Sequence, residues 1–132
     1  MRDFYRAPAS CVANSQQARN VASGADAYYL STGDKARSKD LRRGLTILAR
    51  REESVGQRQA ELASLERELL DRMEKSPLGP AHFASPADWR EATGRRARAL
   101  VEAQADLDST RDKILSFCSD FIAEQANRGI HY

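Results

Sequence analysis

The sequence predicts an all-α fold in which two long helices form an antiparallel coiled-coil hairpin and an N-terminal helix packs at its base. Hydrophobic residues recur every seven positions through two long charged stretches, a spacing typical of coiled-coil seams. Three of the four prolines lie between these stretches, within residues 77–86, where they favour a reversal of the chain. The hairpin and the additional helix together predict an elongated three-helix arrangement.

The N-terminal helix is expected from about Pro8 to Ser31, a stretch that is rich in alanine and contains no further proline. Gly33 can adopt the left-handed conformation that ends many helices. Asp34 or Ser38 can then cap the next helix, because a short polar side chain accepts a hydrogen bond from the free N–H groups of a first turn.

The second helix is expected to continue to about Lys75 and to end at Ser76 and Pro77. Its seam contains one hydrophobic residue in each heptad: Leu41, Leu48, Val55, Leu62 and Leu69. A repeat sustained over this length predicts that a partner helix lies along the whole stretch.

The third helix has the clearest start signal in the chain, because Ser85 is a natural N-cap and Pro86 suits the first helical position. We expect it to end near Arg128, with Gly129 in the position that follows the cap. Its heptad residues are Leu100, Leu107, Ile114 and Phe121. Gly94 could instead end a first, shorter helix, since glycine costs ~1 kcal/mol relative to alanine in a helix interior.

The two seams match each other if the chain folds back about Ala81, so that Leu41 at one end meets Phe121. Charge supports this antiparallel pairing. Residues 35–51 carry seven basic residues and one acidic residue, whereas residues 102–124 carry six acidic and two basic residues. Opposite charges beside a seam select the partner and its direction.

The chain is expected to form one domain, composed of an N-terminal segment and helix (residues 1–33) and the hairpin (residues 34–132) with a tip loop at residues 76–85. Its content of 41% hydrophobic, 7% aromatic and 30% charged residues suits amphipathic helices better than a sheet sandwich. No apolar run is long enough for a signal peptide or a membrane span. We therefore expect an intracellular protein that is soluble or assembled into a particle, and that is not secreted by a classical signal peptide.

The sequence contains no pattern of a catalytic, cofactor or metal site, so we expect a protein that is not an enzyme and uses no cofactor. His82 and His131 lack the His, Cys or carboxylate spacing of a metal site. Cys11 and Cys118 are expected to be buried free thiols. A thin helical rod also has no concave pocket of the kind that holds a substrate.

Two sets of side chains are candidates for binding. Aromatic residues near the ends of the rod can dock either on the chain itself or on a partner protein, because their rings are apolar and often carry a polar group. They are Phe4, Tyr5, Tyr28, Tyr29, Phe83, Trp89 and Tyr132. Basic residues of the second helix can contact phosphates or an acidic surface. They are Lys35, Arg37, Lys39, Arg42, Arg43, Arg50 and Arg51.

These features favour a non-catalytic structural or interaction component of a larger protein assembly, such as a filament, a virion, a secretion machine or a cytoskeletal lattice. The first alternative is a helical protein that binds nucleic acid through residues 35–51. The net charge of +2 gives no general support to this alternative. The second alternative is a small regulator or inhibitor that docks on one enzyme or complex.

Overall fold

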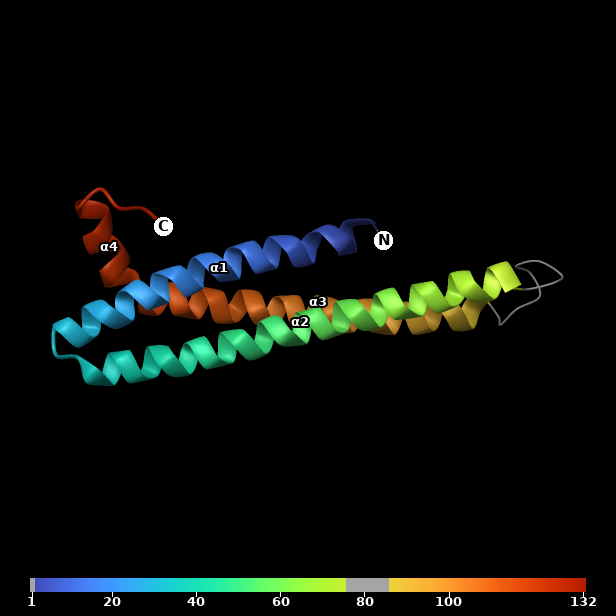
Figure 1. Cartoon of the computed structure of the whole chain (residues 1–132), viewed down its shortest axis with the longest axis horizontal. Coiled ribbons are helices and arrows are strands. Elements are labelled where there is room, and N and C mark those ends of the chain that lie inside the picture. The colour runs from blue at the N-terminus through green and yellow to red at the C-terminus, as the bar shows by residue number, and fades with distance from the viewer. Residues whose placement is uncertain (1, 76–85) are drawn as a thin grey trace.

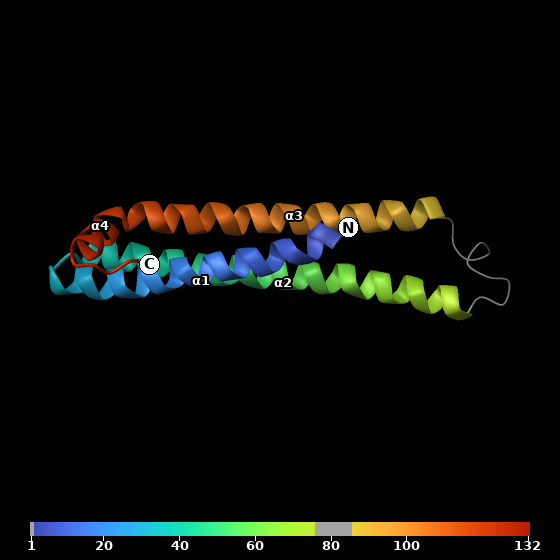
Figure 2. The same ribbon diagram turned by 90° about the horizontal axis from the view of Figure 1, so that it is seen from above.

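The computed structural model describes the backbone of residues 2–75 and 86–132, and the side chains of residues 15–75 and 89–132. These residues form four helices and no strand: α1 (Arg2–Ser31), α2 (Lys35–Lys75), α3 (Pro86–Phe117) and α4 (Ser119–Asn127). α2 and α3 run in opposite directions along an elongated rod, and α1 packs against both (Figure 1 and Figure 2). The predicted all-α fold is confirmed, and the predicted tip loop lies outside the described residues.

The core follows the predicted seam of the hairpin. The heptad residues that are buried in α2 and α3 are Leu41, Leu48, Val55, Leu62, Leu100, Leu107 and Ile114. Across the hairpin, Arg51 lies 3.7 Å from Asp106, and the guanidinium of Arg72 lies 5.3 Å from the centre of the Trp89 ring. Both contacts join residues that lie within about one and a half helical turns of the partners predicted for a chain that folds back about Ala81.

The turn between α1 and α2 is built as the sequence predicts. Gly33 has a φ of 84° and ends α1 with the two reversed backbone bonds of a Schellman motif. Asp34 then caps α2, because its carboxylate accepts the backbone N–H of Arg37 at 3.2 Å. Gly129, with a φ of 81°, ends α4 through the same pair of reversed bonds.

Two helix boundaries can be compared directly with the sequence expectations. α1 begins at Arg2 and passes through Pro8, so the expected start near Pro8 is wrong. A proline removes one backbone donor, and the helix continues on both sides of it. α3 runs without a break through Gly94, which excludes the shorter helix that this glycine could have ended.

The expectation of one continuous third helix is wrong, because the chain turns at Cys118. The backbone of this residue has φ −94° and ψ 14°, outside the helical region, and α4 leaves in a new direction (Figure 1). The expected pairing of Leu41 with Phe121 is therefore also wrong, since no Cα of α4 lies within 8 Å of one in α2. Phe121 is buried against α1 instead, with its ring centre 5.6 Å from that of Tyr28.

Candidate functional site

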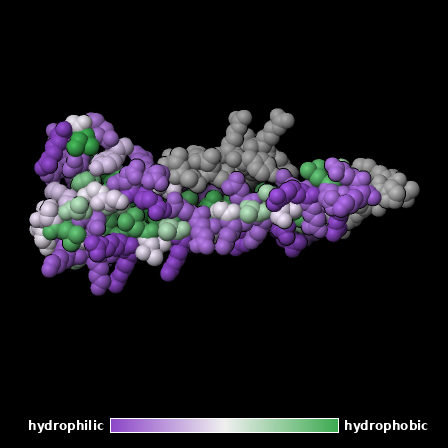
Figure 3. Space-filling view, viewed as in Figure 1, coloured by the Kyte–Doolittle hydropathy of each residue, from purple (hydrophilic) through white to green (hydrophobic). Residues whose placement is uncertain are grey.

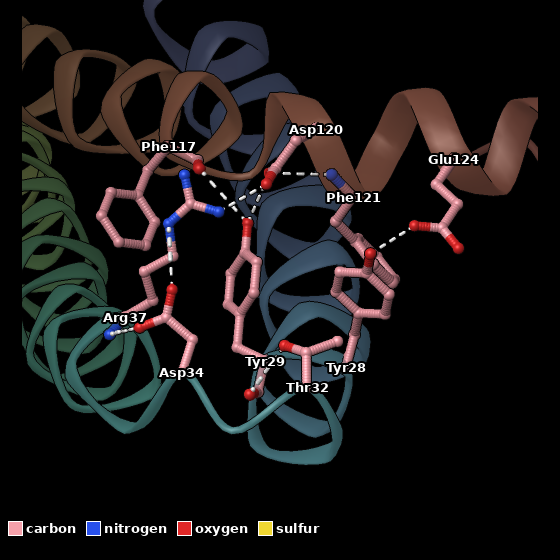
Figure 4. Close-up of polar contacts among 9 residues, drawn as sticks. All are labelled: Tyr28, Tyr29, Thr32, Asp34, Arg37, Phe117, Asp120, Phe121 and Glu124. Atoms are coloured by element: carbon pink, nitrogen blue, oxygen red, sulfur yellow. Dashed lines mark hydrogen bonds and ion pairs between the residues drawn. The ribbon is translucent and has the colours of Figure 1, made fainter.

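The base of the rod, where the α1–α2 turn meets the α3–α4 corner, holds a cluster of polar and aromatic side chains (Figure 4). Tyr29 is 1% exposed, and its hydroxyl donates to Oδ1 of Asp120 at 2.6 Å. Arg37 forms an ion pair with the other oxygen of the same carboxylate. The Arg37 guanidinium also lies 4.9 Å from the centre of the Tyr29 ring and 5.9 Å from that of Phe117. One cluster therefore joins residues of α1, α2 and α3 to the start of α4.

Burial and hydrogen bonding in this cluster shift the pKa values of Asp120 and Tyr29 in opposite directions. The bond from the Tyr29 hydroxyl, followed by the bond from Arg37, lowers the pKa of Asp120 below its usual value. Burial and the bond to Asp120 raise the pKa of Tyr29. The carboxylate thus stays ionised and the phenol stays protonated at neutral pH, so the arrangement stabilises structure and supplies no free general base.

The lowered pKa of Asp120 predicts a pH-dependent contribution to stability. The ionised carboxylate stabilises the fold above the unfolded pKa of about 4, and this contribution disappears as the pH falls through the lower, folded pKa. Asp120→Asn should therefore reduce the loss of unfolding free energy between about pH 4 and pH 2, measured by urea denaturation at each pH. Asp40→Asn is the control, because Asp40 is exposed and forms no ion pair among the described residues. If the unfolding free energy changed equally with pH in wild type and Asp120→Asn, the prediction would be contradicted.

The other aromatic candidates at the base also contact the chain itself. Tyr28 is half-buried and donates a hydrogen bond to Glu124. Tyr132 lies with its ring centre 6.0 Å from that of Phe121, and its backbone carbonyl accepts a bond from Gln17 at 2.8 Å. Tyr132 remains 44% exposed, so it presents an aromatic surface at the base. The side chains of Phe4, Tyr5 and Phe83 lie outside the described residues.

The predicted basic candidates of α2 divide into two groups. Three of them form ion pairs: Arg37 with Asp120 and Asp34, Arg42 with Asp26, and Arg51 with Asp106. The other four are exposed and form no ion pair within the described part of the chain: Lys35, Lys39, Arg43 and Arg50. Their spacing of four, four and seven residues places these four cations on one face of α2.

α1 is anchored to α2 by polar contacts that the sequence did not predict. Glu52 accepts a hydrogen bond from Ser15 at 2.9 Å and pairs with Arg19. Closer to the base, Asp26 accepts a bond from the buried Ser38. Each anchor joins a carboxylate on one helix to a polar side chain on the other. In the sequence, these contacts are indicated only by a polar residue within a mainly apolar helix face.

The expectation that the rod has no concave pocket is wrong, because a groove lies towards its tip end, where α2 finishes and α3 begins. It has a volume of about 720 Å³ and its apolar lining comes from Leu69 on α2 and from Trp89, Ala97 and Val101 on α3. Trp89 is 9% exposed and closes the seam, whereas Val101 is 47% exposed. Trp89 was a predicted candidate, but the other groove residues were not, because they belong to no recognisable sequence motif.

The remaining reactive side chains offer little chemistry. Burial, followed by the nearby charge of Asp120, raises the pKa of Cys118 to about 11, so its thiol stays protonated and weakly nucleophilic. Cys118 is a buried free thiol, as predicted, and the side chain of Cys11 lies outside the described residues. His131 is exposed, and no three potential metal ligands converge anywhere in the described ranges.

Comparison with known proteins provides no assignment: no family model, no curated protein and no solved structure matches this chain. Among the described helices, none combines the length and the apolar character that crossing a membrane would require.

Proposed function

We propose that this chain is a non-catalytic structural or interaction component of a larger protein assembly. The observation that carries the proposal is the apolar groove towards the tip end of the α2–α3 pair. This pair continues beyond the start of α1 (Figure 1 and Figure 2). Figure 3 shows that the tip half of the rod is mainly hydrophilic, with a small apolar area at its upper edge. A localised apolar surface with a charged surround is typical of protein–protein contact.

The proposal predicts that the chain is held in a complex in the cells that produce it. In size-exclusion chromatography of a native extract, detected with an antibody, the chain should elute far ahead of the purified 14.7 kDa protein. The purified chain is the necessary control, because an elongated rod elutes earlier than a globular protein of the same mass. Identical elution of the extract and the purified chain would refute the proposal.

A second candidate function, binding to nucleic acid, is favoured by four cations of α2 that form no ion pair with any side chain the structure describes: Lys35, Lys39, Arg43 and Arg50. Successive cations on one helix face lie about 6 Å apart when four residues separate them, which is comparable to phosphate spacing along a strand. The charge reversal Lys39→Glu with Arg43→Glu should abolish salt-sensitive retention on immobilised DNA. Arg67→Glu, at an exposed residue elsewhere on α2, should leave it unchanged. No retention of wild type at low salt would exclude this function.

A further inference from the structure

A hollow at the base of the rod, where the end of α1 meets the start of α2, is lined mainly by cations and small polar residues. Its volume is about 460 Å³. The lining residues are Leu30, Lys35, Ser38, Lys39, Arg42, Arg43 and Thr46. No carboxylate lines this hollow, and the four cations Lys35, Lys39, Arg43 and Arg50, here called the cation row, run past it along one face of α2.

The two halves of α2 differ in how their charges are arranged. In the base half, Lys35, Lys39 and Arg43 follow one another at spacings of four residues, so that like charges are neighbours on the helix surface and destabilise it. In the tip half, the same spacing joins opposite charges, in the ion pairs Glu68–Arg72 and Asp71–Lys75. A bound anion would therefore relieve repulsion in the base half and not in the tip half.

The carboxylates of the base leave the charge of the cation row in excess. Asp26 of α1 pairs with Arg42, which lies beside the row, at 3.4 Å. Asp40 lines a different hollow, on the side of α2 that faces α3. Glu53 follows Arg50 by three residues, and neither forms an ion pair with a described side chain. The other side-chain carboxylates of residues 15–53 and 106–132 pair with cations outside the row.

The chemistry of this face favours the phosphates of a nucleic acid duplex over other anions. Cations four residues apart are about 6 Å apart along the helix axis, and an acidic protein surface has no such regular spacing of anions. α2 contains no aromatic residue, whereas proteins that bind single strands stack the bases on aromatic side chains. Binding to a membrane surface uses a broad apolar helix face, but the lining of the hollow includes one apolar side chain, Leu30.

We propose that the cation row binds the phosphate backbone of double-stranded DNA and does not read its sequence. Contacts to phosphates position a protein on the duplex but carry no sequence information. This inference rests on the second candidate function given above, and it specifies the form of the nucleic acid and the groups that are contacted.

The test measures fluorescence anisotropy of labelled DNA as the purified full chain is added. The probes are two duplexes of equal length and unrelated sequence, and one single strand of the same length. We expect the two duplexes to bind alike, and the single strand to bind about tenfold more weakly at low salt. For four phosphate contacts, the logarithm of the duplex binding constant should fall against the logarithm of salt concentration with a slope of about −3.6.

Single neutralising substitutions locate the contacts. Lys39→Gln and Arg43→Gln each remove one phosphate contact, so each should make the slope shallower by about one. Arg67→Gln is the matched control, because Arg67 is an exposed cation of α2 that lies outside the row, and it should keep the wild-type slope. Circular dichroism should show the same helix content in all three variants, because each of the replaced side chains is exposed.

A single strand that binds as tightly as the duplexes, a strong preference for one duplex sequence, or an unchanged slope in both Lys39→Gln and Arg43→Gln would overturn the proposal. Displacement of the duplex by polyglutamate or by phosphatidylserine vesicles at equal anion concentration would overturn it in favour of an acidic protein or a membrane surface. Preference for the single strand removes only this inference, whereas no binding to any of the DNA probes also removes the second candidate function. The assembly role is tested separately by the elution of the native extract.

Discussion

Replacing Leu48 by alanine is expected to lower the free energy of unfolding by about 2–5 kcal/mol, which is a large share of the stability of a domain of this size. Leu48 belongs to the heptad seam and is 0% exposed. Truncating it removes buried methyl groups and leaves a cavity, because the two helices cannot close completely over the gap. Urea denaturation followed by far-ultraviolet circular dichroism measures the loss.

The neighbouring residue provides the matched control for this substitution. Ile47 has nearly the same side-chain volume but is 44% exposed, so Ile47→Ala should change the unfolding free energy by less than about 1 kcal/mol. The slope of the unfolding free energy against urea concentration should be the same in both variants. Equal slopes would show that stability has changed and that the compactness of the folded and unfolded states has not. Similar losses from the two substitutions would mean that the seam is not the core of the folded chain.

The hairpin was predictable from sequence because the same local signal is repeated many times. Val55 and Leu62 are buried where the seven-residue repeat places them, and each further heptad adds independent weight to the same conclusion. The turn at Gly33 and the cap at Asp34 were predictable for a different reason. Both depend on backbone preferences of single residues, which act over a few positions only.

The base of the rod was not predictable because its determinants are distant in the chain. Tyr29 and Asp120 are 91 residues apart, and no local pattern indicates that they meet. The hydrophobic repeat continued into Phe121 and favoured an unbroken helix, whereas the turn at Cys118 takes Phe121 away from the seam to α1. Tertiary contacts here outweigh the periodicity, as they often outweigh local propensity.

The candidate groove was missed for a related reason. Trp89 was predicted as a binding candidate from its residue type, while Ala97 and Val101 belong to no recognisable motif. Whether a residue of α3 is exposed or buried depends on which other helices pack against it, and such packing between distant parts of the chain leaves no local signal in the sequence. The consequence is a rod in which three helices pack together from the base, while only α2 and α3 continue to the tip end (Figure 1).

Tyr29 should be the residue outside the seam whose loss costs most. Tyr29→Ala removes a buried aromatic ring and the hydroxyl that donates to Asp120, so the free energy of unfolding should fall by about 3–5 kcal/mol. Tyr29→Phe retains the ring and loses only the hydroxyl, and should cost about 1–2 kcal/mol. The smaller loss is expected because Asp120 still accepts bonds from Arg37 and from the backbone N–H of Phe121.

Hydrogen exchange separates a local effect of Tyr29→Ala from a global one. α4 is attached to α1 mainly through the aromatic and polar contacts at the base, so its amides should lose protection first, before those of the α2–α3 seam. Leu30→Ala is the matched control, because Leu30 is adjacent but 45% exposed, and it should leave α4 protected. If Tyr29→Phe lowered stability as much as Tyr29→Ala, the hydroxyl would be the main stabilising group and the packing argument would be wrong. If instead Tyr29→Ala behaved like Leu30→Ala, the base junction would contribute little and α4 would be held by other contacts.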